Sequence, residues 1–417
     1  MSAFCPNKAL AEQLLTQYGS PLYVYEAETM LAQLQSFRDG FAGLPIKVHY
    51  AAKALTNLNV LALFQQAGTG LDTVSLAEVE MGLMVGFAPN DIVFTPNCVD
   101  FSEIEIAVEK GVRINIENLP NLAAFGERFG GNYACCIRLH PDIQATEQSE
   151  KIAAWHRQSK FGIARTQMAT VHELKEKYNL QIEGIHLHSS SKIMNPEVFR
   201  EGVKTVMDLA LAFPDLRYLD FGGGIRVNYQ EEEAPINLEA LGDEMRPLYA
   251  DFVERYGREL EIWFEPGRYL VGPAGVLLSK VALRKNNGHI EIIGLDTGFN
   301  HLIRPMMYDA YHQIVNLSRS AGPEQKYNVV GNICEIDNFA VQRTMPECKS
   351  GDIVAIMHAG AYGFSMASQY NSRYRPAEVL IEQNQSRLIR KRDRFENLIN
   401  QQVWDKKAEN SMSEHSE

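Results

Sequence analysis

The stretch Val48-His49-Tyr50-Ala51-Ala52-Lys53-Ala54 decides how the rest of the chain is interpreted. Its residues predict a short strand that places the amine of Lys53 at the strand's carboxyl end. Burying an ammonium is costly unless it is paired or neutralised. A Schiff base with an aldehyde neutralises it, and lysine serves covalent catalysis in the same way. A surface lysine at a strand end is the simpler interpretation, and this stretch taken alone favours it.

Seven further strand-like runs follow Lys53 at fairly regular spacing, with amphipathic stretches such as Leu76 to Val85 and Pro196 to Phe213 between them. The runs are Gly70 to Val74, Asp91 to Thr95, Val112 to Ile116, Tyr133 to Leu139, Ile182 to His188, Leu216 to Phe221 and Glu261 to Phe264. Eight strands that alternate with helices predict parallel pairing. A closed (β/α)8 TIM barrel is the economical solution.

The carboxyl ends of these strands carry an unusual number of reactive groups. Chemistry in such barrels gathers at this rim, so the concentration predicts an enzyme. The residues are Lys53, Asp72, Asn97, Asn118, His140, His188, Gly222 to Gly224 and Glu265.

The sequence changes character after the barrel, which is expected to span 26–272. Four strand-like runs follow with no comparable helix between them: Val276 to Leu283, Ile290 to Leu295, Tyr327 to Val330 and Asp352 to Met357. A mostly antiparallel β-domain is therefore predicted for 273–400. The segment 1–25, with the alternating run Leu22 to Tyr25, is expected to pack with it, and 401–417 to form a disordered tail. The basic run Arg387 to Arg394 is interpreted as a solvated helix face.

Composition excludes several classes of protein. The net charge of −12 argues against nucleic-acid binding as the main activity. No signal peptide is recognisable at the first residues, and no apolar run is long enough to span a bilayer. The six cysteines form no C-x-x-C pair, so no metal site or disulfide scaffold is expected. A reduced, cytoplasmic setting fits best.

Two motifs on the rim suggest a cofactor. Gly222-Gly223-Gly224 lets backbone N–H groups approach an anion, although a glycine run is often only a tight turn. Glu265 begins Glu265-Pro266-Gly267-Arg268, and its carboxylate could keep a heterocyclic nitrogen protonated. Pairing with Arg268 in a structural turn is the alternative. His188 could stack on a flat ring and Ser191 could donate to phosphate. Together with Lys53, these groups specify pyridoxal 5′-phosphate.

At this point the chain resembles the alanine-racemase-like (fold type III) enzymes that use pyridoxal phosphate, and among them the diaminopimelate decarboxylase family most closely. The resemblance runs from about Tyr18 to Leu398. Its motifs are Tyr50 to Ala54, Gly70 to Ser75, Ser159 to Gly162, His188 to Ser191, Gly222 to Gly224, Glu265 to Arg268, Arg304-Pro305 with Tyr308, Cys334-Glu335, Gly360 to Gly363 and Tyr370 to Arg373.

The resemblance implies a cofactor site. Lys53 would carry the cofactor, Glu265 would pair with its ring nitrogen, and His188 would pack on the ring. The phosphate would be held by Ser191, Gly222, Gly223, Gly224 and Tyr362. The expected cofactor site is completed by Asp72, Pro266, Gly267 and Arg268.

It also implies a substrate site. Cys334 would donate a proton to the carbanion, and Glu335 would contact the substrate's distal amine. The distal carboxylate would be gripped by Arg268, Arg304 and Tyr308, with Tyr362 nearby. Family enzymes are head-to-tail homodimers whose Cys-Glu segment completes the partner's active site.

The expected reaction is decarboxylation of meso-2,6-diaminopimelate to L-lysine and CO2, the last step of lysine biosynthesis. Guanidinium groups pair bidentately with a carboxylate, which lysine and ornithine lack at their far ends. A carboxynorspermidine-type decarboxylase is the nearest alternative, and such enzymes typically lack the arginine at Arg268. A non-catalytic pyridoxal-phosphate-binding barrel is another, although such proteins stop after the barrel. The chain departs from the family pattern at Ile336 to Asn338, Ser189-Ser190, His358 and Tyr374, without losing a group that the mechanism needs.

Overall fold

Eight parallel strands close into a barrel in the computed structural model, which describes residues 3–140, 159–188, 196–230, 236–319 and 321–404. Neighbouring strands pair in parallel, and β9 closes the ring against β2. The strands are β2 (Ile46–Ala51), β3 (Gly70–Thr73), β4 (Ile92–Phe94), β5 (Arg113–Ile116), β6 (Ala134–Leu139), β7 (Gln181–Leu187), β8 (Tyr218–Asp220) and β9 (Glu261–Phe264). All eight overlap the predicted runs, so the TIM barrel is confirmed.

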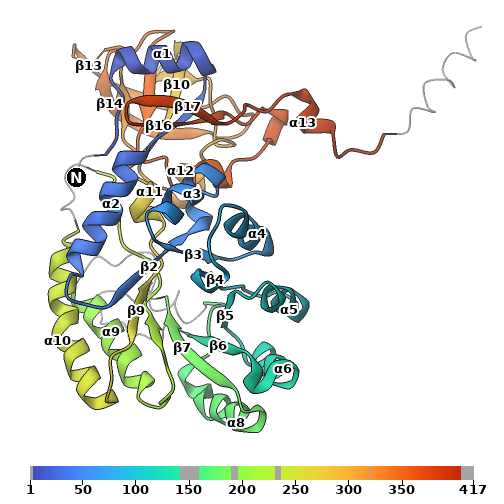
Figure 1. Cartoon of the computed structure of the whole chain (residues 1–417). Helices are drawn as coiled ribbons and strands as arrows, with labels where there is room; N and C mark the ends of the chain where they lie inside the picture. The colour runs from blue at the N-terminus through green and yellow to red at the C-terminus, as the bar shows by residue number, and fades with distance from the viewer. Residues whose placement is uncertain (1–2, 141–158, 189–195, 231–235, 320, 405–417) are drawn as a thin grey trace, which may run out of the picture.

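Helices surround the barrel on its outside (Figure 1). They are α2 (Ala27–Gly40), α3 (Leu58–Gln66), α4 (Leu76–Met84), α5 (Phe101–Glu109), α6 (Leu119–Phe129), α8 (Met168–Tyr178), α9 (Pro196–Ala210) and α10 (Leu238–Tyr256). Several begin at a residue whose side chain accepts a first-turn N–H, which satisfies a donor that the helix cannot. Asn57, Ser75 and Asn118 do so for α3, α4 and α6. Asn118, expected among the reactive groups of the rim, is therefore engaged as a cap.

A nine-stranded, mostly antiparallel sheet forms the second part of the molecule, at the top of Figure 1. Its strands are β1 (Leu22–Glu26), β10 (Gly275–Asn286), β11 (Glu291–Leu295), β12 (Ile314–Asn316), β13 (Glu324–Val330), β14 (Asn338–Pro346), β15 (Ile353–Ile356), β16 (Ala377–Glu382) and β17 (Gln385–Arg390). The N-terminal β1 lies between β10 and β16. Helix α1 (Lys8–Tyr18) packs Leu14 and Leu15 against Leu22 and Val24 of β1. The short helices α11 (Arg268–Val271) and α12 (Arg304–Tyr308) lie toward the barrel.

The basic run Arg387 to Arg394 is not a helix face, and that prediction was wrong. Its first half belongs to β17, which pairs antiparallel with β16. Gln383 and Asn384 connect the two strands with φ angles of 51° and 60°. Two consecutive positive φ values are typical of the two-residue turn whose twist suits a hairpin. Helix α13 (Phe395–Ile399) begins only after the run.

The predicted segment boundaries at 1–25, 26–272, 273–400 and 401–417 stay predictions. The last barrel strand ends at Phe264, and the next strand of the sheet begins at Gly275. Most of the predicted tail, 405–417, lies outside the described residues, and so does Ser191. In the part of the chain that the structure describes, no helix is both long and apolar enough to cross a membrane.

Candidate active site

Lys53 lies just beyond β2, in the single turn η1 (Ala52–Ala54). Its ammonium contacts the carboxylate of Asp72 on the neighbouring strand β3. The Asp72 side chain is fully buried, whereas 36% of the Lys53 side chain is exposed. Burial by itself would lower the pKa of Lys53, but the charges of Asp72 and Glu265 outweigh burial and raise it. The amine therefore lies at the carboxyl rim with its charge balanced by buried carboxylates.

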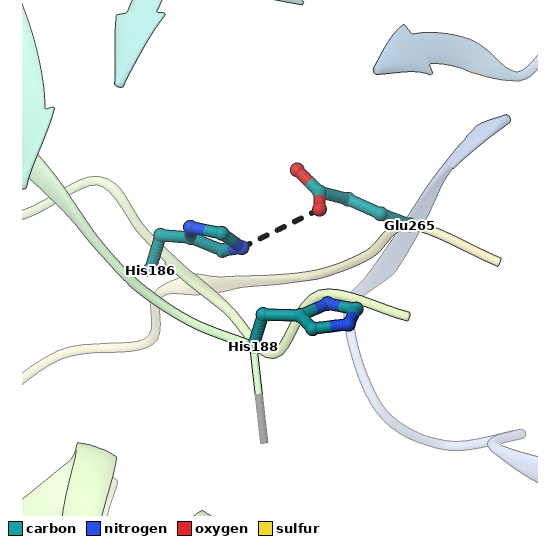
Figure 2. A group of neighbouring side chains, drawn as sticks. All are labelled: His186, His188 and Glu265. Carbon is teal, nitrogen blue, oxygen red and sulfur yellow. Dashed lines mark ion pairs between the residues drawn. The ribbon is translucent and has the colours of Figure 1, made fainter. Parts of the chain in front are cut away.

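Glu265 follows β9, and its carboxylate pairs with His186 of β7 beside His188, which follows that strand, as Figure 2 shows. Glu265 Oε2 lies 3.4 Å from His186 Nε2, and the residue is 4% exposed. Burial alone would raise the pKa of Glu265, but the neighbouring His186 and Lys53 hold it well below its usual range. Glu265 Oε1 has no hydrogen-bond partner among the described residues. An ionised carboxylate with one unpaired oxygen suits a protonated ring nitrogen.

His188 presents an uncharged ring beside Glu265. The Gly223 N–H donates to His188 Nδ1 at 3.2 Å, so Nδ1 is the acceptor nitrogen. Burial, helped by the charge of Arg138, lowers the pKa of His188 to about 3. A ring nitrogen of His186, a ring nitrogen of His188 and a carboxylate oxygen of Glu265 all lie within 4.8 Å of one another. A neutral, flat imidazole in this place can pack on an aromatic ring.

The glycine loop after β8 approaches the same residues closely. Gly222 and Gly224 have φ angles of 63° and 95°, a region that favours glycine. A Cβ at Gly222 would lie 2.6 Å from His188 Nδ1, and one at Gly223 would lie 2.5 Å from the Glu265 carbonyl oxygen. The N–H groups of Gly222 and Gly223 donate to Asp220 and His188. The N–H groups of two of the three predicted phosphate-binding glycines are therefore already engaged, and the phosphate contact of this loop stays a prediction.

The β-domain reaches the lysine turn through Tyr362. The Tyr362 N–H donates to the Ala54 carbonyl at 2.8 Å. The Arg268 guanidinium lies 5.4 Å from the centroid of the Tyr362 ring. Gly267 packs under the same turn, where a Cβ would meet the Ala54 side chain at 2.9 Å, and the Pro266 carbonyl accepts an N–H from β2. The Glu265–Arg268 segment and Tyr362 thus lie around the turn that carries Lys53.

Arg304 is a buried arginine, only 4% exposed, and forms no ion pair with any described residue. Its Nη1 donates to the hydroxyl of Tyr229 at 2.6 Å. A desolvated guanidinium without a carboxylate partner is suited to bind one from a ligand. Tyr308, at the other end of α12, is 58% exposed and does not share this buried environment.

Cys334 and Glu335 are exposed and make their hydrogen bonds within the β-domain. The amide of Asn371 donates to Cys334 Sγ at 3.2 Å, and the hydroxyl of Tyr370 donates to Glu335 at 3.0 Å. In the described ranges, neither residue forms a hydrogen bond or ion pair with the residues around Lys53. A single chain therefore does not bring the predicted proton donor into contact with the predicted cofactor lysine.

Sequence reasoning missed four residues that the structure brings to the site. His186 stands two residues before His188, and Asp220 two before Gly222, so the two-residue period of a strand could have revealed both. Arg138, whose guanidinium lies 4.5 Å from the ring centroid of Phe161, is the last residue but one of the predicted strand Tyr133 to Leu139. Tyr229 lies 75 residues from Arg304 in the sequence, and no local signal indicates their contact.

The residues around Lys53 fit pyridoxal 5′-phosphate. The lysine amine can bind the aldehyde, and Glu265 offers an unpaired buried oxygen to the ring nitrogen. The neutral ring of His188 can cover one face, and the glycine loop packs directly against His188 and the Glu265 backbone, where a Cβ would clash.

Comparison with known proteins supports this assignment. The family described as pyridoxal-dependent decarboxylase, pyridoxal binding domain, matches residues 27–272. The diaminopimelate decarboxylase of Methanothermobacter thermautotrophicus is 37% identical over 399 residues, 93% of each chain. The diaminopimelate decarboxylase of Archaeoglobus fulgidus is 32% identical over 400 residues, 94% of each chain.

Solved structures extend the similarity through both parts of the fold. Diaminopimelate decarboxylase from M. jannaschii, in complex with L-lysine, matches with a TM-score of 0.88 at 28% identity, covering 95% of this chain and 94% of that one. The Helicobacter pylori enzyme complexed with L-lysine gives 0.83 at 30% identity, covering 93% and 98%. The barrel and the β-domain are thus shared together, and the chain belongs to the pyridoxal-dependent decarboxylases, within the diaminopimelate decarboxylase family.

Proposed function

We propose that the chain decarboxylates meso-2,6-diaminopimelate to L-lysine and CO2, the last step of lysine biosynthesis, with pyridoxal 5′-phosphate as its cofactor. Relatives named for this activity align over 93% or 94% of the chain. The observation that carries the proposal is the buried, ionised Glu265 beside Lys53 at the rim of a pyridoxal-binding barrel.

When bound, pyridoxal phosphate supplies a conjugated ring that accepts the electron pair left at Cα as CO2 departs. In our proposal Lys53 holds the cofactor covalently and His188 packs on its ring. Glu265 keeps the ring nitrogen protonated, because a carboxylate whose pKa is lowered stays ionised at neutral pH. Asp72, at the Lys53 amine, balances the lysine charge.

The far end of the substrate carries both an amine and a carboxylate. We assign the carboxylate to Arg268, Arg304 and Tyr308, and the amine to Glu335. Arg304 supports this most directly, because it is buried without an ion pair among the described residues. Lysine and ornithine would leave this guanidinium unpaired, which is costly in a desolvated site.

Replacing Arg304 or Arg268 by Met should reduce kcat/KM for diaminopimelate by the equivalent of about 2–5 kcal/mol, the scale for breaking a desolvated charge pair. Steady-state kinetics on diaminopimelate and lysine measure the effect. Arg246→Met is the matched control, because Arg246 pairs with Asp243 on the outer helix α10. Equal turnover of lysine and diaminopimelate by the unmodified enzyme would contradict the carboxylate assignment.

A substrate panel separates the activities of this fold. CO2 release should be rapid from meso-diaminopimelate and slow from carboxynorspermidine, lysine and ornithine. The physical reason is the same buried guanidinium, which only the first of these can pair through a distal carboxylate. Faster CO2 release from carboxynorspermidine than from diaminopimelate would indicate a role in polyamine synthesis. No CO2 release from any of the four compounds would contradict the proposed decarboxylase activity.

We further propose a head-to-tail homodimer with shared active sites. The proposal is supported by the exposure of Cys334 and Glu335, and by exposed apolar side chains near the predicted substrate residues. Ile336 is 76% exposed and Met307 is 56% exposed. A cytoplasmic setting is also proposed, because all six cysteines are free thiols.

A further inference from the structure

Asp220 is a buried carboxyl group that no step of the proposed mechanism uses. It ends β8 and has no exposed surface. Its Oδ1 accepts the Gly222 N–H at 2.8 Å, whereas its Oδ2 has no hydrogen-bond partner among the described residues. A buried oxygen without a partner is costly. Asp220 Oδ2 therefore needs a hydrogen-bond partner that the contacts above do not supply.

The neighbouring strand end supplies a second such oxygen. Glu265 Oε1 is buried and lacks a partner in the same described set, while Glu265 Oε2 faces His186. Strand register places Asp220 opposite Trp263, two residues before Glu265 on β9. The Glu265 N–H donates to the Gly222 carbonyl at 2.8 Å, and the Glu265 carboxylate raises the pKa of Asp220 through its charge and a side-chain hydrogen bond. One proton between them would satisfy both oxygens.

Two neighbouring, buried carboxyl groups resist ionising together, because each negative charge disfavours the other. The titratable and charged groups that face this pair come from β8 itself and from the elements packed against it. They are His49, Lys53, Asp72, Cys136, Arg138, His186, His188 and Tyr218. Lys53 and His186 favour the charged form of Glu265, whereas Asp220 receives only one backbone N–H. The proton therefore belongs to Asp220.

The pKa values agree in direction with this assignment. Burial, reinforced by the charge of Glu265, raises the pKa of Asp220 well above its usual range. The pKa of Glu265 is held low despite burial. The environments of the two carboxyl groups thus push their pKa values apart, as is typical of acid and base pairs in enzyme sites.

We propose that Asp220 is a positioning residue that stays protonated at neutral pH and donates its O–H to Glu265. The Glu265 carboxylate is then supported by Asp220 at Oε1 and by His186 at Oε2, which fixes its orientation, and the second lone pair of Oε1 stays available to the cofactor ring nitrogen. An ionised Asp220 would repel Glu265 instead. The inference rests on the proposed role of Glu265 toward the cofactor ring, and goes beyond it by naming the group that holds Glu265 in place.

The pH dependence of stability tests the protonation state without using activity. An unfolded aspartate ionises near pH 3.9, whereas a folded Asp220 with a raised pKa keeps its proton. The stability contributed by this group therefore falls as pH rises above about 4. Asp220→Asn keeps the shape and a donor but cannot ionise. The measured quantity is the difference between the Tm of this variant and the Tm of the wild-type holoenzyme. As the pH rises from 5 to 8, this difference should increase by about 1–2 °C per pH unit.

Asp215→Asn is the matched control, because the Asp215 side chain is 75% exposed on the connection before β8. Its Tm difference should not change with pH. A flat or falling profile for Asp220→Asn would mean that Asp220 is ionised in the folded protein and would overturn the proposal. If Asp220→Asn does not fold, infrared spectroscopy of wild-type protein labelled with 13C-aspartate is the alternative test. The C=O band of a protonated aspartate should be present at pH 8. Absence of that band at pH 8 would overturn the proposal equally.

Kinetics test the positioning role separately. Asp220→Asn should keep kcat within about threefold of wild type, whereas Asp220→Ala should lose about tenfold or more, the scale of a hydrogen bond to a charged group. Equal kcat values for Asp220→Ala and wild type would overturn the positioning role. The Tm profile does not depend on the substrate. A rising profile in a protein that failed to decarboxylate diaminopimelate would therefore reject the proposed function and keep the Asp220–Glu265 pair.

Discussion

Lys53→Ala should abolish the visible absorption of the purified protein and lower decarboxylation by about 10³-fold or more, the scale for removing a covalent catalytic group. Unmodified protein should be yellow, because its lysine holds the aldehyde of the cofactor. Borohydride should remove the visible band and fix the cofactor's mass on the peptide that contains Lys53. Absorption spectra, peptide mass spectrometry and CO2 release measure the three effects.

Lys47→Ala is the matched control for this experiment. Lys47 lies on the same strand β2, pairs with Asp91 at 2.7 Å and is not part of the proposed site. The variant should keep the visible band and its turnover. A Lys53→Ala protein with wild-type colour and activity would show that the cofactor is attached elsewhere.

The barrel could be predicted from the sequence because amphipathic stretches such as Leu76 to Val85 and Pro196 to Phe213 separate its strand-like runs. The same regularity located Lys53, Asp72, His188, Glu265 and the glycine loop, since parallel strands bring their carboxyl ends to one rim. The structure places Lys53 against Asp72 and places Glu265 against His186 of β7. What the sequence could not give is the partner of each charge, because those contacts join residues far apart along the chain.

The β-domain was harder to predict for a physical reason. Its strands pair across long separations, as β1 does with β10 and β16. Their order therefore depends on tertiary contacts rather than on local patterning. The hairpin of β16 and β17 depends on two positive φ angles at Gln383 and Asn384, which are not typical turn glycines. Charge spacing suggested a helix there, and the turn geometry overrides it.

The exposure of Cys334 makes a sharp prediction about assembly. In one chain the Cys334 thiol is held by Asn371 and forms no hydrogen bond with the described residues around Lys53. If Cys334 donates a proton to the substrate, as the family resemblance implies, it must do so in the site of a second copy. A two-fold interface then creates two equivalent composite sites, each with Lys53 from one subunit and Cys334 from the other.

Lys53→Ala and Cys334→Ala homodimers should each be nearly inactive, because removal of a general acid alone costs about 10²–10⁴-fold. Mixing the two variants should restore activity. In a heterodimer, one site has neither group, whereas the other combines the intact Lys53 of the Cys334→Ala subunit with the intact Cys334 of the Lys53→Ala subunit. Complete random exchange should give about a quarter of the wild-type specific activity, since half of the dimers carry one working site of two.

Native mass spectrometry of the mixture establishes that exchange has taken place before activity is compared. Cys98→Ala is the matched control for the thiol, because Cys98 is also exposed but lies on the barrel. This variant should remain active without mixing. If confirmed heterodimers show no recovery, Lys53 and Cys334 do not meet across subunits. Cys334 would then be an exposed thiol of the β-domain, and the proton would have to come from a residue of the barrel's own rim.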